Sequence, residues 1–382
     1  MLIGIDASRA FLKQRTGIEE YSYQVIKNLR DQLSDSEVIL YLRKNQQVDF
    51  DLPNNWSIKV INFSRFWTQF GLSLEMLLHP VATLFVPAHT VPFIHPENTI
   101  VTVHGLEYEF CPEAYSWFAR FYMRLTIKKS CYWASKIVSV SENTKRDLMN
   151  LYGVAEEKIL VIYEGYDRET RNFQFPPQRD KPGAKISNFQ KKSNDKISEI
   201  KTGEIKFLLF IGRIEERKNI SNIVEAFEIL KEKYKIPHKF VFAGKPGFGH
   251  ETIKYKIQNT KYSEDIVELG FVSEEEKWDL LRKADVFVFP TLYEGFGIPI
   301  LEAQSVGCCV VASNNSSIPE IAGDSAVITN PEKPEEIAAS INSFISNKSL
   351  KDDIIVKGLE NVQRFSWDKC ANEISQLLLK KN

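Results

Sequence analysis

A regular alternation of short apolar segments with longer helical patterns, present twice along the chain, is the feature that most restricts its fold. In the first half, the segments rich in β-branched and aromatic residues are Leu2 to Ile5, Val38 to Leu42, Ile58 to Phe63, Thr83 to Val86, Thr99 to Val103, Ile137 to Val140 and Leu160 to Tyr163. Those in the second half are Lys206 to Ile211, Lys239 to Ala243, Ile266 to Leu269, Asp285 to Phe289 and Cys308 to Ala312. Strands that alternate with helices predict a mostly parallel, doubly wound sheet. The sequence therefore predicts an α/β protein with two similar domains that face each other across a cleft.

A polar stretch separates the two series. It runs from Arg168 to Glu204 and contains Pro176-Pro177 and Pro182-Gly183, which is typical of a linker or a surface insertion. We therefore expect a first domain over residues 1–167, a polar linker or insertion over 168–205 and a second domain over 206–365. An amphipathic helix is predicted at the end, within 366–382. A length of 382 residues accommodates two domains.

Charge and cysteine content exclude several classes of protein. Forty-nine Lys and Arg stand against 50 Asp and Glu, so no overall positive field attracts nucleic acid. The five cysteines show no CxxC spacing, which indicates reduced thiols in a cytoplasmic protein rather than a zinc site. Asp6 interrupts the first apolar segment too early for an export signal. We therefore expect a cytoplasmic protein that binds no nucleic acid.

One stretch, Met76 to Pro96, lacks Asp, Glu, Lys and Arg and has the length of a membrane span. Four prolines within it argue against a helix through a bilayer. It is interpreted instead as the end of a helix, a buried strand and a surface loop. Helix starts are predicted at two capping boxes, Thr16 with Glu19 and Ser273 with Glu276.

The first candidate site follows the predicted strand that ends near Pro290. The chain continues from Thr291 through Glu294-Gly295-Phe296-Gly297 into a helical stretch that holds Glu302. In open α/β sheets, ligands bind beyond the carboxyl ends of the strands, where glycine loops let the amides at a helix start approach an anion. The two glutamates suit hydrogen bonds from the hydroxyls of a polyol.

A second candidate site follows the strand that ends at Ile211. Gly212-Arg213 and Lys218 come directly after it. A guanidinium fork and a compact ammonium together suit a diphosphate that gains negative charge as it leaves. The alternative is a solvated charged turn, which such a run of charges often forms.

These motifs, taken in order, resemble the group 1 retaining nucleotide-sugar glycosyltransferases. The segments that carry the resemblance are Val103-His104-Gly105, Val138 to Glu142 with Lys145 and Arg146, Ile162 to Asp167, Gly212-Arg213 with Lys218-Asn219, Glu294 to Glu302, and Ile318-Pro319-Glu320-Ile321. The resemblance implies the GT-B fold, with two Rossmann-like domains, acceptor binding in the first, donor binding in the second and a final helix that crosses back to the first.

The same resemblance assigns roles to individual residues. Arg213 and Lys218 would hold the donor diphosphate, Glu302 the ribose hydroxyls, and Glu294 with the amides of Phe296 and Gly297 the sugar. His104 would lie beside the transferred sugar. The remaining donor-site positions implied by the motifs are Gly17, Gly212 and Gly295. No cofactor and no metal ion are expected, because Asp49-Phe50-Asp51 follows a polar loop and is interpreted as a chance match to a metal-binding Asp-x-Asp motif.

Three positions depart from the family pattern. His104-Gly105 stands where the family often has His-Asp, Tyr163-Glu164-Gly165 stands where it often has Pro-Asn-Gly, and the polar segment is longer than usual. The first two departures concern acceptor-side and hinge contacts. None removes a predicted donor-site residue.

The resulting hypothesis is a hexosyltransferase that uses a nucleotide sugar and a glycan or lipid-linked acceptor, as in bacterial-type surface polysaccharide assembly. The alternatives are a catalytically silent sugar- or nucleotide-binding scaffold of the same fold and, less well supported, a nucleotide-sugar oxidoreductase. Residues 115–146 hold seven basic residues and one acidic residue among several aromatics. This pattern fits peripheral contact with the inner face of a membrane and a core helix equally well.

Overall fold

The chain is described here by a computed structural model that covers residues 1–12, 15–166 and 205–380. It divides into two compact units. The first unit comprises Met1–Glu109, Ser116–Gly165 and Phe365–Asn382, and the second comprises Phe110–Tyr115 and Tyr166–Arg364. Of the predicted linker over 168–205, all but Ile205 lies outside the described residues.

The described part of the first unit contains a parallel sheet of seven strands in the order β3-β2-β1-β4-β5-β6-β7. The strands are β1 (Leu2–Asp6), β2 (Glu37–Arg43), β3 (Trp56–Ile61), β4 (Thr83–Val86), β5 (Asn98–Val103), β6 (Lys136–Ser139) and β7 (Ile159–Val161). Each corresponds to a predicted segment. The central strands β4 and β5 are almost entirely buried because helices cover both faces of the sheet.

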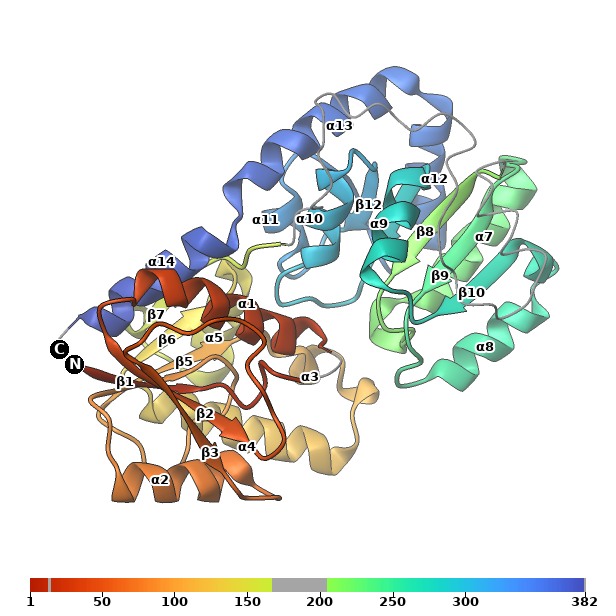
Figure 1. Cartoon of the computed structure of the whole chain (residues 1–382). Helices are drawn as coiled ribbons and strands as arrows, with labels where there is room; N and C mark the ends of the chain where they lie inside the picture. Colours follow the sequence, from red (N-terminus) through yellow and green to blue (C-terminus); the bar gives the residue numbers. More distant parts are fainter. Residues whose placement is uncertain (13–14, 167–204, 381–382) are drawn as a thin grey trace. The chain divides into compact units, whose positions relative to one another are not determined.

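Helices cover both faces of this first sheet (Figure 1). On one face α14 (Trp367–Leu379) packs against α1 (Gly17–Gln32), and the other face carries α2 (Ser73–Leu78), α4 (Trp117–Trp133) and α5 (Glu142–Tyr152). The short turn η1 (Trp67–Leu72) leads into α2, and η3 (Glu156–Lys158) precedes β7. Between β5 and α4 the chain forms α3 (Glu107–Phe110) and η2 (Pro112–Ala114), of which η2 belongs to the second unit. The predicted final helix is therefore confirmed, and it belongs to the first unit.

The described part of the second unit contains a parallel sheet of six strands in the order β10-β9-β8-β11-β12-β13. They are β8 (Phe207–Ile211), β9 (Lys239–Ala243), β10 (Ile266–Gly270), β11 (Val286–Phe289), β12 (Val310–Ser313) and β13 (Val327–Thr329). The sequence predictions missed β13, an edge strand of three residues that is partly exposed and therefore lacks a long apolar run. Two doubly wound sheets confirm the predicted α/β class.

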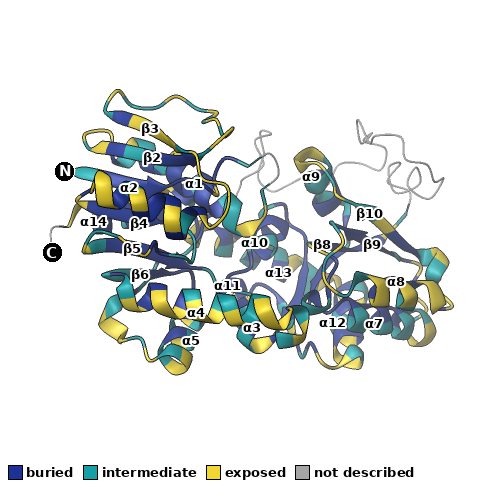
Figure 2. Ribbon diagram, turned by 90° about the horizontal axis from the view of Figure 1, so that it is seen from below, coloured by how far each residue is buried: buried dark blue, intermediate teal, exposed yellow. Residues whose placement is uncertain are grey.

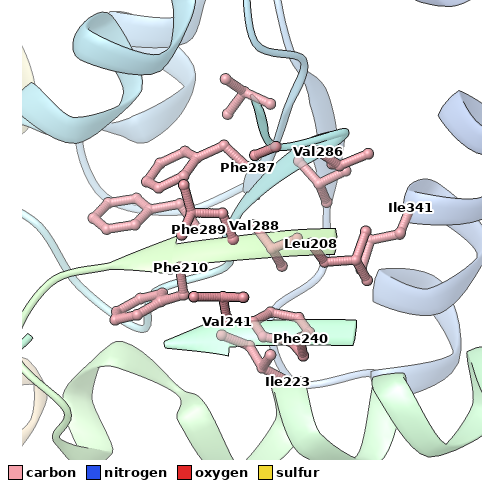
Figure 3. Close-up of a cluster of buried hydrophobic side chains, with 14 of the residues drawn as sticks. Leu208, Phe210, Ile223, Phe240, Val241, Val286, Phe287, Val288, Phe289 and Ile341 are labelled. Carbon is pink, nitrogen blue, oxygen red and sulfur yellow. The ribbon is translucent and has the colours of Figure 1, made fainter. Parts of the chain in front are cut away.

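Ten helices surround this second sheet in the described residues. They are η4 (Glu216–Lys218), α7 (Ile220–Lys233), α8 (His250–Asn259), η5 (Ser263–Asp265), α9 (Glu274–Lys283), α10 (Ile298–Ser305), α11 (Ile318–Ala322), α12 (Pro334–Ser346), α13 (Lys348–Asn361) and η6 (Val362–Arg364). The core lies between the sheet and these helices, with Phe210, Phe240 and Phe289 on the strands and Ile223 and Ile341 on α7 and α12 (Figure 3). This core fixes the strand ends from which the candidate site extends.

Local sequence signals account for several boundaries. Both predicted capping boxes are present, at Thr16 before α1 and at Ser273 before α9. The stretch from Met76 to Pro96 contains the end of α2, the buried strand β4 and a loop, as predicted. All five cysteines are buried, and none forms a disulfide. Among the described residues, no helix combines the length and apolarity that a bilayer span requires.

Candidate functional site

Two loops at the carboxyl edge of the second sheet form the core of the candidate site. The loop after β8 makes a short 3-10 turn, η4, and then reverses at Asn219, whose φ of 63° lies in the left-handed region that Asn tolerates better than most residues. The Asn219 side-chain amide donates to the Pro290 carbonyl at 2.9 Å and to the Pro331 carbonyl at 2.6 Å. One asparagine thus ties the turn to the chain beyond β11 and β13.

Hydrogen bonds to main-chain carbonyls join the same turn to the loop after β11. The Leu292 amide donates to the Arg217 carbonyl at 3.0 Å, and Arg217 Nη1 donates to the Tyr293 carbonyl at 3.0 Å. The two loops therefore hold each other in register. Side chains that project from them, among them Lys218 and Glu294, are positioned by backbone structure rather than by a single contact.

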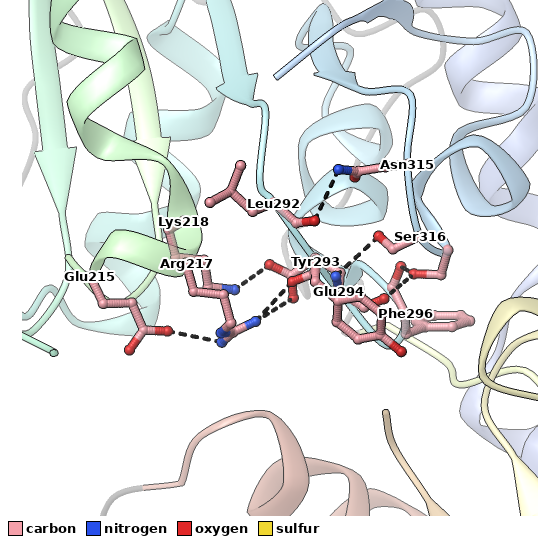
Figure 4. Close-up of polar contacts among 10 residues, drawn as sticks. Glu215, Arg217, Lys218, Leu292, Tyr293, Glu294, Phe296, Asn315 and Ser316 are labelled. Carbon is pink, nitrogen blue, oxygen red and sulfur yellow. Dashed lines mark hydrogen bonds and ion pairs between the residues drawn. The ribbon is translucent and has the colours of Figure 1, made fainter. Parts of the chain in front are cut away.

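Lys218, Arg217 and Glu294 form one charge cluster, in which Lys218 is buried and the other two are partly buried; it is called the buried cluster (Figure 4). Lys218 Nζ donates to Glu294 Oε1, and Arg217 Nη1 lies 3.6 Å from Glu294 Oε2. Arg217 also bonds Glu215 Oε1 at 2.9 Å through Nη2. An ammonium has three N–H donors, and the bond to Glu294 uses one of them.

Burial and neighbouring charge shift the pKa values of Glu294 and Lys218 in opposite directions. Burial raises the pKa of the Glu294 carboxyl, but the positive charges of Lys218 and Arg217 outweigh it and hold that pKa below its usual value. Burial lowers the pKa of the Lys218 ammonium, and the charge of Glu294 offsets this only in part. Glu294 is therefore a carboxylate that depends on its two cations.

A third loop, after β12, fixes the conformation of the glycine-containing segment. The Glu294 amide donates to Ser316 Oγ at 3.1 Å, and Ser317 Oγ donates to the carbonyls of Glu294 at 3.0 Å and Phe296 at 2.6 Å. Gly297 then caps α10 with a φ of 128°, a conformation that favours glycine. The predicted Glu294-Gly295-Phe296-Gly297 segment thus leads directly into a helix start, as its pattern indicated.

Gly212 and Arg213 lie on the loop between β8 and η4, beside the loop after β9. A Cβ at Gly244 would stand 1.7 Å from the Gly212 carbonyl oxygen, so the two loops approach too closely for any side chain there. Arg213 is exposed, and its stem lies against Gly247, where an added Cβ would meet the Arg213 Cγ at 2.7 Å. Lys218 belongs to the buried cluster and Arg213 does not, so their joint grip on a diphosphate stays a prediction.

Glu302 belongs to a different ion pair. It lies on α10, is buried, and accepts a bond of 2.7 Å from Lys277 Nζ on α9. Burial lowers the pKa of the Lys277 ammonium, but Glu302 and Glu274 outweigh this effect and raise it above its usual value. The sequence predictions missed Lys277 because nothing in the spacing links residues 277 and 302.

In the first unit, His104 follows β5 and both of its ring nitrogens contact oxygen atoms. Nδ1 lies 3.1 Å from Glu164 Oε1, and Nε2 lies 2.9 Å from the Pro87 carbonyl oxygen. A carbonyl oxygen only accepts, so Nε2–H donates to Pro87, and the Glu164 carboxyl lies against the other ring nitrogen. Glu164, one of the departures from the family pattern, is thus the partner of the predicted catalytic histidine.

Packing restricts the His104 ring further. Tyr21 meets it edge-on at 4.5 Å between ring centroids, and His89 does so at 5.3 Å. Burial, assisted by the neighbouring His104 and Arg9, lowers the pKa of His89 to about 3, so His89 is neutral near pH 7. Gly165, next to Glu164, abuts the start of α14, where a Cβ would stand 2.2 Å from the Trp367 nitrogen.

Gly17 is the first residue of α1 and is exposed. A Cβ at this position would meet no atom within 4 Å. Packing within the protein therefore does not require glycine at this position. The approach of the Gly17 backbone to the donor phosphates stays a prediction.

The sequence predictions also missed Arg217, the second cation on Glu294. It stands within the charged run after β8, but spacing alone favoured Arg213 and Lys218. Asn219, at the position where the turn needs a left-handed residue, is the signal that could have placed the turn and hence Arg217.

Comparison with known families places both halves of the chain. The model described as "Glycosyl transferases group 1" matches residues 190–360, and the model described as "Glycosyltransferase Family 4" matches residues 16–170. Between them, the two matches identify the chain as a glycosyltransferase. It is 25% identical over 375 residues to O-antigen chain mannosyltransferase B of Escherichia coli, covering 94% of each chain. It is 24% identical over 291 residues to O-antigen chain mannosyltransferase RfbU of Salmonella typhimurium, covering 76% of this chain and 71% of that one.

Solved structures agree on the GT-B fold of this glycosyltransferase. A sucrose-phosphate synthase from Thermosynechococcus elongatus matches with a TM-score of 0.71 and 15% identity, over 98% of each chain. HepE of Anabaena in complex with UDP-glucose matches with a TM-score of 0.71 and 17% identity, over 99% of this chain and 98% of that one. The fold implied by the sequence resemblance is confirmed.

Proposed function

We propose that the protein transfers a hexosyl group from a nucleoside diphosphate sugar to a hydroxyl of a saccharide or lipid-linked acceptor during assembly of a surface polysaccharide. The observation that carries this proposal is the buried cluster of Lys218, Arg217 and Glu294 beyond the carboxyl ends of β8 and β11. Parallel α/β sheets bind ligands at this edge. A preorganised ammonium in a buried loop stabilises the charge that a leaving diphosphate gains.

The names of related proteins narrow the choice of donor. The Escherichia coli and Salmonella typhimurium relatives are named O-antigen chain mannosyltransferases. HepE was solved with UDP-glucose. A mannosyl donor is therefore the first to test and a glucosyl donor the second.

In this proposal the second unit binds the donor and the first binds the acceptor. Lys218 and Arg213 bind the diphosphate, Glu294 with the Phe296 and Gly297 amides binds the sugar, and Glu302 binds the ribose. His104 contacts the transferred sugar. Lys277 holds Glu302 as a carboxylate, which can accept hydrogen bonds from hydroxyl groups.

We further propose that the anomeric configuration is retained. The bond from C1 to the diphosphate oxygen breaks, the acceptor oxygen bonds C1 on the same face, and the acceptor proton passes to the leaving phosphate. NMR of the product linkage measures the anomeric configuration, and an inverted linkage would contradict retention. The step is proposed to need no metal ion, so activity should persist in EDTA. Loss of activity in EDTA that Mg²⁺ or Mn²⁺ restores would contradict this part.

The decisive experiment offers UDP- and GDP-linked glucose and mannose to the full-length protein and measures release of nucleoside diphosphate, with and without saccharide acceptors. We expect release from one donor, raised by the correct acceptor, and loss of release in Lys218→Met. Thermal-shift measurement with each donor monitors binding separately. Binding without release under any acceptor would support the alternative of a silent scaffold.

A further inference from the structure

The first unit exposes a large group of apolar side chains that lie outside the candidate site. The exposed apolar residues of this group, called the aromatic face here, are Phe63, Phe66, Phe70, Leu74, Leu77, Leu78, Phe93, Ile94, Trp117, Phe118, Phe121 and Leu125. They come from the β3–β4 connection with η1 and α2, from the loop after β4 and from α4. Trp117 is 78% exposed, Phe118 69% and Leu77 59%. Patches of this kind mark interaction sites on soluble proteins.

Direct contacts join the three segments into one surface. The ring centroids of Phe70 and Phe93 lie 5.8 Å apart, and those of Phe93 and Trp133 lie 5.9 Å apart. Gln69 Nε2 donates to Tyr122 Oη at 2.9 Å, which fixes η1 beside the middle of α4. In Figure 2 α2 and α4 both show exposed residues along their outer sides. The apolar residues of the three segments are therefore neighbours.

The structure answers the question that the sequence left open for residues 115–146. On α4 only Ile127, Ser130 and Cys131 are buried. The aromatic side chains of this helix are therefore not buried in the core. Trp117 and Phe121 stack on each other at 5.7 Å in the exposed part of the helix. Aromatic rings held at a surface in this way need a partner of matching chemistry.

The charge around the aromatic face is positive. Helix α4 carries Arg120, Arg124, Lys128 and Lys129 and no acidic residue. Glu109 pairs with both arginines, whereas Lys128 and Lys129 are exposed. Between Phe63 and Pro96 the single acidic residue is Glu75, which lies 3.4 Å from Lys59 Nζ and 3.3 Å from His79 Nδ1.

We propose that the first unit docks on the surface of an anionic lipid bilayer through the aromatic face. Phe, Trp and Leu side chains insert at the boundary between headgroups and acyl chains, and Lys128 and Lys129 bind the anionic headgroups. A symmetric contact between two copies would bring two positively charged faces together, so charge repulsion disfavours self-association. The chemistry of the aromatic face thus favours a bilayer over a second copy.

Vesicle flotation with the full-length protein tests this proposal independently of the transfer reaction. Vesicles of phosphatidylcholine alone are compared with vesicles that also contain phosphatidylglycerol. We expect co-flotation with the anionic vesicles and at least tenfold less with the neutral ones. High salt should reduce binding to the anionic vesicles because it screens the lysines.

Two variants divide the contributions of charge and apolar contact. Lys128→Glu with Lys129→Glu reverses the exposed charge, and Leu77→Ser with Phe118→Ser removes exposed apolar side chains from two of the three segments. Each double variant should lower binding to anionic vesicles at least tenfold. The matched control is Lys254→Glu with Tyr255→Ser on α8 of the second unit, where Tyr255 is 68% exposed. It should bind as the unchanged protein does.

Thermal unfolding confirms that each variant is folded before its binding is interpreted. Absence of wild-type co-flotation with anionic vesicles would overturn the proposal. So would equal loss of binding in the control and in the aromatic-face variants. If light scattering shows a dimer that the Leu77→Ser with Phe118→Ser variant converts to a monomer, and no flotation occurs, the aromatic face binds a second copy instead.

Discussion

The two units each place a carboxyl group against a nitrogen-bearing side chain at the carboxyl edge of a parallel sheet, but these side chains differ in kind. In the first unit the pair is His104 with Glu164, and in the second it is Lys218 with Glu294. Lys218 donates to Glu294 with Arg217 beside it, whereas the His104 ring is held between Glu164 and the Pro87 carbonyl. The second unit thus offers two basic side chains, and the first offers an imidazole ring of fixed orientation.

The difference matches what each half of a glycosyl transfer would require. A diphosphate is anionic at every stage, so its binding site gains from cations. A sugar hydroxyl is neutral and donates or accepts hydrogen bonds, which a histidine fixed by Glu164 and the Pro87 carbonyl can match. Each variant below changes one unit and leaves the other intact.

The largest effect is expected for Lys218→Met. Methionine keeps the length of the apolar stem and removes the ammonium, so the leaving diphosphate loses one preorganised donor. The kcat of donor cleavage should fall about 100-fold to 1,000-fold. Arg213→Met should lower kcat less, because Arg213 is exposed and water screens its charge on the diphosphate. If Lys218→Met keeps full activity while remaining folded, Lys218 does not bind the leaving group.

The next effect concerns stability in the second unit. Glu294→Leu leaves Lys218 buried without its carboxylate, which should lower the free energy of unfolding of this unit by about 3 kcal/mol. Lys218→Met combined with Glu294→Leu should recover most of the loss but none of the activity. Hydrogen exchange of peptides from β8 and β11 measures both variants. Equal stability of the single and double variants would show that the pair is not coupled.

A smaller effect is expected in the first unit as pH falls. The pKa of His89 is about 3 when folded and 6.5 as a free side chain, so the unfolded chain binds the proton more readily below pH 6.5. The contribution of neutral His89 to the free energy of unfolding is therefore fully present above pH 6.5 and is lost as the pH falls toward 3. Between pH 7 and pH 5 the loss should be about 2 kcal/mol.

His89→Gln removes the titrating imidazole, so the free energy of unfolding of this variant should depend less on pH between pH 7 and pH 5. Urea unfolding followed by tryptophan fluorescence suits this measurement, because Trp56, Trp67, Trp117, Trp133 and Trp367 all belong to the first unit. If the unfolding of the unchanged protein and of His89→Gln depends on pH in the same way, the pKa of His89 is not lowered.

The smallest effect is expected for Glu164. Glu164→Ala should lower kcat about tenfold, a loss of about 1.4 kcal/mol in transition-state stabilisation, with the donor KM nearly unchanged. Glu164→Gln keeps a hydrogen-bonding group beside Nδ1 and should recover part of the activity. A purely structural role would instead lower stability in both variants without a split between kcat and KM.

Periodicity and turn chemistry were sufficient to predict most of the fold. Twelve of the strands coincide with apolar segments of the sequence, and the capping boxes at Thr16 and Ser273 mark two helix starts. Strand β13 was missed because a partly exposed strand of three residues carries no periodic signal. Local sequence patterns thus predict only those helices and strands that are long enough to show a periodic arrangement of apolar residues.

Side-chain pairing was harder to predict than strands. Glu294 was expected to bind a sugar, but spacing did not reveal that Lys218 and Arg217 would both contact it. The reason is geometric: the turn at Asn219 decides which side chains of the charged run point inward, and its hydrogen bonds reach residues 290 and 331. Lys277 with Glu302 joins two helices in the same way.

The return of α14 to the first unit has a consequence for synthesis on the ribosome. Helix α1 emerges early, but its partner α14 and the Trp367 backbone that meets Gly165 emerge only after the whole second unit. The nascent first unit therefore lacks this partner of α1, including the Trp367 ring that packs edge-on against Tyr21, throughout most of translation. Domains generally fold in order from the N-terminus. Here the first unit is completed last, and a message truncated before codon 367 would yield a chain that chaperones retain.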